Sequence, residues 1–386
     1  MAKPGNIMPL PPLALYIHFP WCLRKCPYCD FNSHELPRDL DVSAYVDALI
    51  ADFSRQYPSA GDRPIASIFI GGGTPSLLPG DAVARLLAAI GELAPLVEGA
   101  EITLEANPGA ADAGHFSAYR DSGVNRLSIG VQSFDEGSLK ALGRIHGRAD
   151  AVAAFQTARQ AGFGNINLDL MFGLPHQTQE AAMADLRMAM GLGPEHLSWY
   201  QLTLEPNTPF SQAPPSLPDE DSLYDIQETG LEFLASSGME RYEVSAFSRP
   251  GRECRHNLNY WEFGDYLGIG AGAHGKLTLG GGQVRRNWKE RHPRRYLTAP
   301  QAEAGRRGLG TEDLILEFMM NALRLRRGFA LPLFEARTGL PLSRIEVSLR
   351  KAMDKGLLES LPGFVLPTEL GFRFLNDLIG FFEAPA

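Results

Sequence analysis

The stretch "YIHFPWCLRKCPYCDFNSHE", residues 16–35, contains three of the chain's four cysteines within eight positions. Cys22, Cys26 and Cys29 follow an apolar run that resembles a β-strand, and the fourth, Cys254, lies more than two hundred residues further on. Clustered thiols in a chain with few cysteines are typical of metal binding or redox chemistry, and not of a disulfide-stabilised secreted protein. The stretch therefore predicts a metal site directly after a first strand.

The overall composition is that of a globular protein with ample material for a core. The chain has 386 residues, of which 44% are hydrophobic and 21% charged, and its formal net charge is −9. An acidic balance argues against a nucleic-acid partner, which requires a basic surface. The apolar runs are too short to span a bilayer, and the proline-broken N-terminus is a poor signal peptide. We therefore expect a cytoplasmic protein.

Short β-rich runs alternate with amphipathic segments of helical period along the first two hundred residues. Such alternation predicts βαβ units and a parallel sheet. Six strands fit a partial (β/α)6 barrel of the TIM type better than a long open sheet. The expected strands are Leu13–Phe19, Ser67–Gly73, Glu101–Asn107, Arg126–Ser133, Ile166–Gly173 and His196–Glu205.

Polar residues gather where these strands end, which is where a barrel of this type carries its functional site. The cysteines follow the first strand, "GGGTP" (71–75) ends the second, and Glu105 lies in the third. The fourth ends in "GVQSF" (130–134), and Asp169 lies in the fifth. We expect these groups to share one mouth of the barrel.

The pattern changes near residue 305, which predicts a division of the chain into a tail (1–12), a barrel with an extension (13–304) and a C-terminal module (305–386). The module reads as three helices, a hairpin and a last helix, an order that resembles a winged helix. Its 11 Lys and Arg nearly balance its 10 Asp and Glu, so DNA binding lacks an electrostatic basis. We expect a module for packing or partner binding. Its basic residues Arg324, Arg326 and Arg327 have two interpretations, pairing with carboxylates of a ligand or a solvated charged face, and we expect the solvated face.

The cysteine spacing admits two metal sites. A structural zinc site would need His34 as the fourth ligand. A 4Fe–4S cluster normally takes four thiolates. Three thiolates leave one iron open, which is useful only if a small molecule with an amine and a carboxylate binds there.

The pattern C-x3-C-x2-C after a first barrel strand resembles the radical S-adenosylmethionine (SAM) superfamily. This resemblance implies a 4Fe–4S cluster on Cys22, Cys26 and Cys29, with SAM at the open iron. In that superfamily the reduced cluster passes one electron to the sulfonium of SAM, and the C–S bond breaks to give methionine and a 5′-deoxyadenosyl radical. The protein's task is to position this cofactor and exclude solvent.

Further motifs, "FIGGGTPSLL", "LEANP", "RLSIGVQSFD", "GRIH" and "NLDLMFGLP", are similar to those of the oxygen-independent coproporphyrinogen III oxidase family. In that family a second SAM molecule is bound, here matched by Gln132, Arg144 and Asp169. The resemblance implies that the contacts to the first SAM are made by Tyr16, Tyr28, Gly72, Gly73, Thr74 and Glu105.

Two features differ from the oxidase pattern. Phe31 occupies the position of a fourth oxidase cysteine, and "HNLNYW" (256–261) matches an HNxxYW signature found in related haem chaperones. The resemblance implies haem binding through His256, with Tyr260 or Cys254 as alternative iron ligands and Trp261 flanking the macrocycle. Imidazole is a common ligand of haem iron, and thiolate and phenolate are rarer ones.

The leading interpretation is a haem chaperone on a radical SAM scaffold, without a residue assigned to catalysis. It would take haem from a donor and deliver it to respiratory haem proteins, with transient association at the membrane. The alternative is an oxygen-independent coproporphyrinogen III oxidase, and a weaker third is a radical enzyme for an unrelated small molecule.

Overall fold

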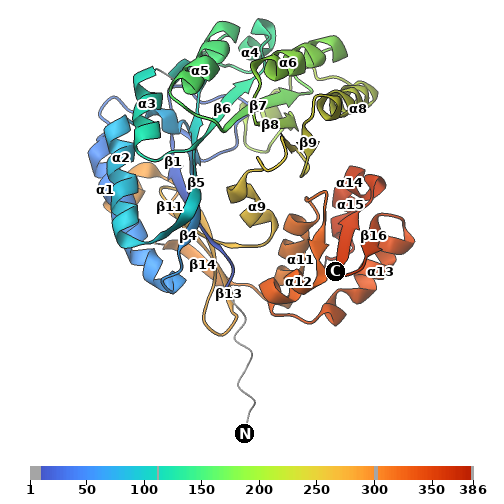
Figure 1. Ribbon diagram of the computed structural model, residues 1–386. Helices are drawn as coiled ribbons and strands as arrows, with labels where there is room; N and C mark the ends of the chain where they lie inside the picture. The colour runs from blue at the N-terminus through green and yellow to red at the C-terminus, as the bar shows by residue number, and fades with distance from the viewer. Residues whose placement is uncertain (1–9, 111–112, 300–302, 384–386) are drawn as a thin grey trace.

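The computed structural model describes residues 10–110, 113–299 and 303–383, and its central element is a 12-stranded β-sheet. Six consecutive strands of this sheet are parallel neighbours (Figure 1), which confirms the predicted βα repeat and partial barrel. Each predicted strand is present, with ends shifted by a few residues. The six are β1 (Leu13–Phe19), β4 (Ile65–Gly72), β5 (Leu96–Ala106), β6 (Arg126–Gln132), β7 (Ile166–Phe172) and β8 (His196–Gln201).

Helices cover the outer face of the sheet, because each presents an apolar stripe to it. In the first helix, the buried residues Tyr45, Val46, Leu49 and Phe53 recur at helical spacing, and Asp41 caps the N-terminus by accepting from the Ala44 amide. The covering helices are α1 (Val42–Gln56), α2 (Gly80–Leu93), α3 (Ala113–Asp121), α4 (Glu136–Ala141), α5 (Arg148–Gln160), α6 (Gln179–Leu192) and α8 (Glu220–Ser236).

Further strands extend the sheet beyond both ends of the parallel set, and its two edge strands are not paired with each other. Beyond β8 lie β10 (Ala246–Ser248) and β9 (Glu240–Arg241). At the other edge β11 pairs in parallel with β1, and three antiparallel strands follow it. The sequence predicted only turns and a basic stretch in this region. These strands are β11 (Asp265–Ile269), β12 (His274–Thr278), β13 (Val284–Lys289) and β14 (Glu303–Gly308).

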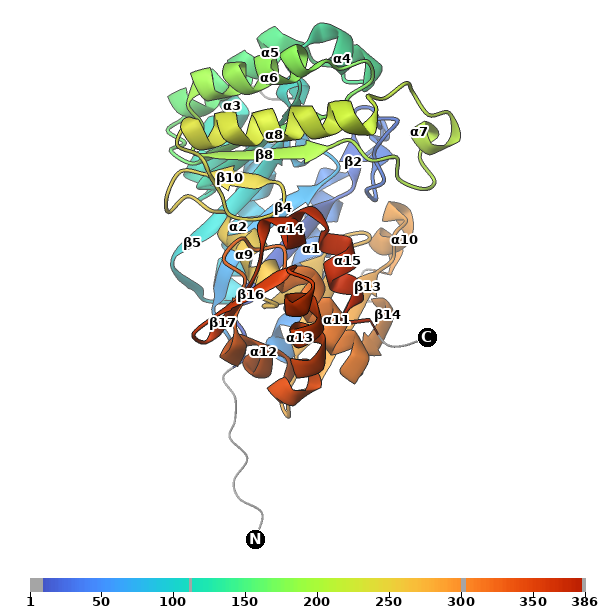
Figure 2. The ribbon, with the colours of Figure 1, turned by 90° about the vertical axis from the view of Figure 1, so that its right-hand side faces the viewer.

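A short helix, α9 (Arg255–Trp261), fills the open side of the barrel. It packs against β4 on one side and against α11 of the C-terminal module on the other. Figure 2 shows the module in front of the sheet, below α8, on the side where α9 lies. The HNxxYW segment is therefore packed between the barrel and the C-terminal module.

The C-terminal module has its own apolar core, which Phe263 and Val284 of the preceding segment join. Its three-stranded sheet has the order β15-β17-β16 and its first helix is α11 (Thr311–Ala322). The β14 strand of the large sheet reaches Gly308, so α11 is the first element outside that sheet. The other elements are β15 (Phe329–Ala330), α12 (Leu331–Thr338), α13 (Glu346–Asp354), β16 (Leu358–Leu361), β17 (Phe364–Pro367), α14 (Glu369–Arg373) and α15 (Leu375–Gly380).

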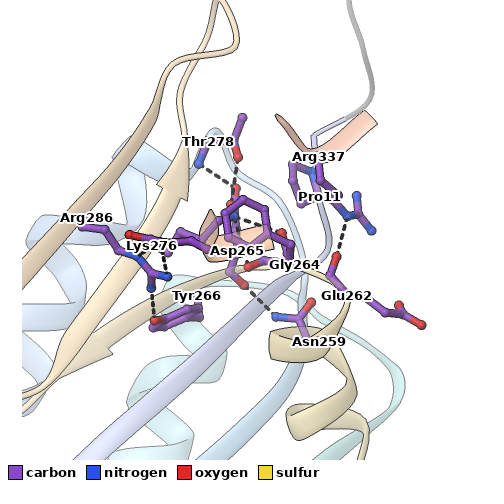
Figure 3. Close-up of polar contacts among 12 residues, drawn as sticks. Pro11, Asn259, Glu262, Gly264, Asp265, Tyr266, Lys276, Thr278, Arg286 and Arg337 are labelled. Carbon is purple, nitrogen blue, oxygen red and sulfur yellow. Dashed lines mark hydrogen bonds and ion pairs between the residues drawn. The ribbon is translucent and has the colours of Figure 1, made fainter. Parts of the chain in front are cut away.

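A buried polar network around Asp265 joins these parts (Figure 3). The fully buried Asp265 carboxylate accepts hydrogen bonds from Lys276 Nζ at 2.9 Å, Arg63 Nη1 at 2.9 Å and the Thr278 amide at 2.9 Å. Burial lowers the pKa of Lys276 to about 8, against the opposite effect of the Asp265 charge. A buried ion pair is costly to break, so this network holds β11 and β12 together.

Neighbouring hydrogen bonds fix the C-terminal end of α9 and the segment that follows it. The Asp265 amide donates to the Pro12 carbonyl at 3.0 Å. Asn259 Nδ2 of α9 donates to the Asp265 carbonyl at 2.9 Å. Arg337 of the module donates through Nε to the Glu262 carbonyl at 3.1 Å. Residues 1–9 of the predicted tail lie outside the described part of the chain.

Within the described ranges, the helices are too short or too polar to cross a membrane.

Candidate functional site

The cysteine loop is closed by a short parallel pair of strands, β2 (Trp21–Cys22) and β3 (His34–Glu35). The Cys29 amide donates to the Cys26 carbonyl at 3.2 Å. Lys25 Nζ reaches across the loop to the carbonyls of Phe31 at 3.1 Å and Ser33 at 3.2 Å. The loop thus holds its own shape, which keeps its thiols at set positions.

All three loop cysteines are free and half-buried, and they line one cavity of about 800 Å³. Each thiol has a polar neighbour. Thr74 hydrogen-bonds to Cys22, Arg144 Nη1 lies 3.8 Å from Cys26 Sγ, and Ser33 Oγ lies 3.7 Å from Cys29 Sγ. Burial raises the pKa of Cys22 and of Cys29 above the ordinary thiol value. A bound cation or cluster would favour the thiolates that burial disfavours.

The donor set fits an iron–sulfur cluster better than a single zinc ion. His34 is not among the residues that line the cavity, and its ring lies 5.8 Å from that of His292. In the described ranges, no three His, Cys, Asp or Glu side chains are arranged to hold one metal ion. Three thiols at the rim of a large cavity match a cluster with one iron open to a ligand. Phe31, 59% exposed, also lines this cavity.

The "GGGTP" segment lies directly against the cysteine loop. The Gly73 amide donates to the Phe19 carbonyl at 2.7 Å, and the Thr74 amide donates to the Trp21 carbonyl at 2.8 Å. A Cβ at Gly73 would lie 2.5 Å from the Trp21 carbonyl oxygen, and Gly72 has a φ of +118°. Glycine is required here because the backbone approaches closely and turns into a region that other residues avoid.

Two carboxyl groups face the cavity from neighbouring parts of the sheet. Glu105 accepts a hydrogen bond from the Gly72 amide at 3.0 Å, and Asp169 accepts from Ser128 Oγ at 3.0 Å and Asn167 Nδ2 at 2.8 Å. Burial, together with the charge of Asp169, raises the pKa of Glu105 to about 8. Burial also raises the pKa of Asp169. A cationic ligand, or one whose hydroxyl groups donate hydrogen bonds, would lower both pKa values by stabilising the ionised carboxylates.

The remaining residues predicted for the second cofactor also lie in this cavity. Tyr200 donates to Gln132 Oε1 at 2.7 Å, and Arg144 Nη2 donates to the Gly130 carbonyl at 2.7 Å. Gln132 has a φ of +68°, which is unusual for a residue other than glycine and typical of functional positions. Gln132, Arg144 and Asp169 are thus brought together with the cysteines and Glu105.

Tyr28 lines the cavity as well, whereas Tyr16 does not. The Tyr16 hydroxyl lies 2.9 Å from His18 Nδ1, and its ring stacks on Phe69 with centroids 6.3 Å apart. His18 Nε2 in turn lies 2.9 Å from the Asn32 carbonyl oxygen of the cysteine loop. In this structure Tyr16 supports the loop through His18, and a direct contact with SAM stays a prediction.

The HNxxYW histidine lies inside the protein and not at the cavity. His256 is 1% exposed, and its Nδ1 and Nε2 lie 3.0 Å from Ser67 Oγ and 2.9 Å from Tyr260 Oη. Burial lowers the pKa of His256 to about 3. Cys254 is also fully buried, with its Sγ 3.5 Å from Glu101 Oε1. Iron binding at His256 would require one of its two hydrogen bonds to break, and the assignment stays a prediction.

The end of the motif approaches the main cavity indirectly. Tyr260 and Trp261 line a separate small cavity of about 140 Å³. The Arg324 guanidinium carbon lies 4.4 Å from the Trp261 ring centroid, and Arg324 lines the cysteine cavity. The expectation of a solvated face for Arg324 is therefore wrong, because the module folds back onto α9 and turns this side chain inward.

The sequence reading missed several polar residues of the cavity wall, namely Ser128, Ser198 and Tyr200. They alternate along β6 and β8 with buried apolar residues, so a period-two search of those strands would have found them. Arg324 has no such signal, because its position depends on the docking of the C-terminal module.

Comparison with known proteins agrees with this geometry. The family model described as "Radical SAM superfamily" matches residues 16–189, and "HemN C-terminal domain" matches residues 309–374. Among solved structures, coproporphyrinogen III oxidase (HemN) from Escherichia coli superposes with a TM-score of 0.81 at 24% identity, over 98% of this chain and 92% of that one. The fold is that of a radical SAM protein.

Curated relatives narrow the assignment. "Heme chaperone HemW" from Escherichia coli is 49% identical over 97% of this chain and 99% of its own length. The protein of the same name from Bacillus subtilis is 34% identical over 95% of this chain and 98% of its own length. The chain belongs to this HemW family.

Proposed function

We propose that the protein is a haem chaperone that holds a 4Fe–4S cluster, binds SAM beside it and carries haem. The observation that carries the proposal is the full-length likeness to HemW proteins on a chain whose three loop thiols share one cavity. Cys22, Cys26 and Cys29 would hold the cluster. When bound, such a cluster supplies one electron for cleavage of the SAM C–S bond.

The chain's own residues provide the surroundings for SAM. The cavity, about 800 Å³, lies within the range of small-molecule sites. Tyr28 offers a ring at the cysteine loop, Thr74 and the glycines of the "GGGTP" turn form one wall, and Glu105 offers a carboxylate for ribose hydroxyls. Arg144 puts a positive charge next to the cysteine loop, with its Nη1 3.8 Å from Cys26 Sγ.

Haem delivery is the second half of the proposal. We infer that haem is received from a donor and passed to respiratory haem proteins, with the protein in the cytoplasm and in transient contact with the membrane. The support is the name that the relatives carry and the HNxxYW segment at α9. His256, Tyr260 and Cys254 are the candidate iron ligands and Trp261 the flanking ring; all but Trp261 are held in the protein interior by hydrogen bonds to neighbouring side chains.

The second candidate function is oxidative decarboxylation of coproporphyrinogen III, which the likeness of the fold to HemN favours. Phe31 and the HNxxYW segment favour the chaperone. A chaperone should bind haem and leave coproporphyrinogen III unchanged, whereas the oxidase should decarboxylate coproporphyrinogen III. One protein preparation, assayed with each of these ligands, therefore tests both functions.

The test uses protein reconstituted with iron and sulfide under anaerobic conditions. Titration with haem should saturate at a fixed stoichiometry, and incubation with coproporphyrinogen III, SAM and reductant should yield no decarboxylated product. Multiple turnovers to protoporphyrinogen IX would refute the chaperone assignment. For the cluster, Cys26→Ala should lose iron and sulfide relative to Cys254→Ala, whose thiol lies outside the loop. Bound zinc in place of iron would refute the cluster and support a structural zinc site at the cysteine loop.

A further inference from the structure

Arg324 is the group through which the C-terminal module reaches the cysteine cavity. It lies two residues after the end of α11, and the adjacent Leu325 pairs with Glu243 as an antiparallel bridge. The Arg326 amide donates to the Tyr242 carbonyl at 3.0 Å, which ties the same segment to the edge of the barrel. The backbone on which Arg324 stands is thus held by hydrogen bonds to the barrel.

Neighbouring residues hold the Arg324 side chain in place but do not use all of its hydrogen-bond donors. Its guanidinium lies over Trp261 at 4.4 Å, and Nη2 donates to Glu243 Oε2 at 3.1 Å. Among the described residues Nη2 is its one bonded nitrogen, and the buried Nε has no acceptor. A buried donor without an acceptor costs about 1–3 kcal/mol. The Arg324 side chain is 29% exposed to solvent, and it forms part of the wall of the cysteine cavity.

Glu243 engages one nitrogen of the Arg324 guanidinium, Nη2, and leaves the donors of Nη1 for an anion. Glu243 offers one carboxylate to the guanidinium and already accepts from the Ser245 amide at 3.0 Å. Arg327, three residues on, pairs with Glu262 at the surface and does not line the cavity. An Arg guanidinium with open donors at a cavity wall is suited to a ligand carboxylate, which it binds with direction as well as charge.

We propose that Arg324 binds a carboxylate of the ligand in this cavity, and that this carboxylate is a propionate of haem. The inference rests on the proposed haem binding and names the group that recognises haem at the cavity. The methionine carboxylate of SAM is the competing anion. Arg144 serves that role better, because it lies 3.8 Å from Cys26 Sγ, where a ligand of the open iron must approach.

The position of Arg324 also gives the C-terminal module a part in the function. The guanidinium stacks on the last residue of HNxxYW and belongs to the cavity wall at the same time. A propionate on Arg324 would therefore place haem in the cavity, next to the side of its wall where Arg324 contacts Trp261 of the motif helix. The module would contribute a binding residue and not only a packing surface.

The test compares haem with haem dimethyl ester, in which both propionates are neutral, in the same detergent. The reconstituted full-length protein is titrated as wild type, Arg324→Gln and Arg324→Lys. Glutamine keeps a donor for Glu243, and lysine keeps the charge. Arg327→Gln is the matched control, because it removes the same charge from a side chain that is 62% exposed.

We expect wild type to bind haem more tightly than the diester. Arg324→Gln should weaken haem binding about 10- to 100-fold, equivalent to about 1.4–2.8 kcal/mol, and leave diester binding unchanged. Arg324→Lys should lie between, and Arg327→Gln should match wild type. SAM binding, measured separately, should be the same in all variants.

Equal affinity of wild type for haem and diester would overturn the inference even if Arg324→Gln does not fold. Loss of SAM binding with haem binding intact would assign Arg324 to SAM and also overturn it. No haem binding by wild type at all would refute the proposed chaperone function itself, an outcome distinct from a failure at Arg324.

Discussion

Replacing His256 with alanine tests how the HNxxYW helix is held in the barrel opening. The imidazole lies between the barrel and α9, with Nδ1 next to Ser67 of β4 and Nε2 next to Tyr260 one turn further along the helix. Its ring is 5.1 Å from that of Phe69, centroid to centroid. We expect His256→Ala to destabilise the fold whether or not this residue also binds iron.

The magnitude follows from the contacts. Two buried hydrogen bonds contribute about 1 kcal/mol each. Deleting a ring that is 1% exposed leaves a cavity, and large aromatic truncations of this kind cost about 3–5 kcal/mol in total. Imidazole is smaller than phenyl, so its cavity alone costs less than this, and the two lost hydrogen bonds add to that cost. With both effects included, we expect the free energy of unfolding to fall by about 3–5 kcal/mol.

The pH dependence gives a second signature. Burial holds the pKa of His256 near 3, below the unfolded value of about 6.5. The neutral imidazole therefore stabilises the native state above pH 6.5, and that contribution is lost as the pH falls toward 3. Between pH 7 and pH 5 wild type should lose about 2 kcal/mol from this residue, and His256→Ala should lack this slope.

The assay is urea unfolding at pH 7 and pH 5, followed by the far-UV circular dichroism of the apoprotein. Exposed His292→Ala is the control, and its stability should stay within about 0.5 kcal/mol of wild type. A His256→Ala variant within 1 kcal/mol of wild type, with an unchanged pH profile, would refute the reasoning. The haem spectrum of the same variant then reports on iron ligation separately.

Three other changes test the site and its frame. Gly73→Ala should abolish cluster assembly, measured as bound iron, because its Cβ would lie 2.5 Å from the Trp21 carbonyl oxygen. Asp265→Asn should lower the free energy of unfolding in urea by about 3–5 kcal/mol, because buried Lys276 loses its counter-charge. Glu105→Gln should weaken SAM binding about tenfold in equilibrium dialysis, the effect of about 1.4 kcal/mol. It should not lower stability at pH 8.5, because the raised pKa of Glu105, about 8, makes this carboxyl group destabilise the native state as the pH rises from about 4.5 to about 8, and that cost stays constant at higher pH.

Each of these predictions has a clear contrary result. Normal iron content in Gly73→Ala would show that the turn does not contact the cysteine loop as described. Wild-type stability of Asp265→Asn would mean that Lys276 is neutral or solvated in the native state. Unchanged SAM affinity of Glu105→Gln would remove the carboxylate from the cofactor site.

Much of the site was predictable because its signals are local in the chain. The cysteine motif can be recognised in the sequence because Cys22, Cys26 and Cys29 lie within eight positions of one loop. The glycines at 71–73 are likewise consecutive, so their motif is visible without knowledge of the fold. The six strands were predictable because the pattern of hydrophobic residues along a short segment indicates which of its side chains are buried, without information from the rest of the chain. Parallel strands then bring their ends to one side, so Glu105 and Asp169 meet the cysteines without further information.

The tertiary structure alone decided the parts that depend on distant packing. The strands β11 to β14 join the sheet through pairing across more than two hundred residues, which periodicity does not report. His256 is buried because Ser67 and Tyr260 surround it, and Arg324 faces the cavity because the C-terminal module docks on Trp261. The sequence by itself determined the cysteine cluster loop and the barrel strands. Contacts between remote segments determined the environment of the HNxxYW motif, since such contacts arise only when the whole chain has packed.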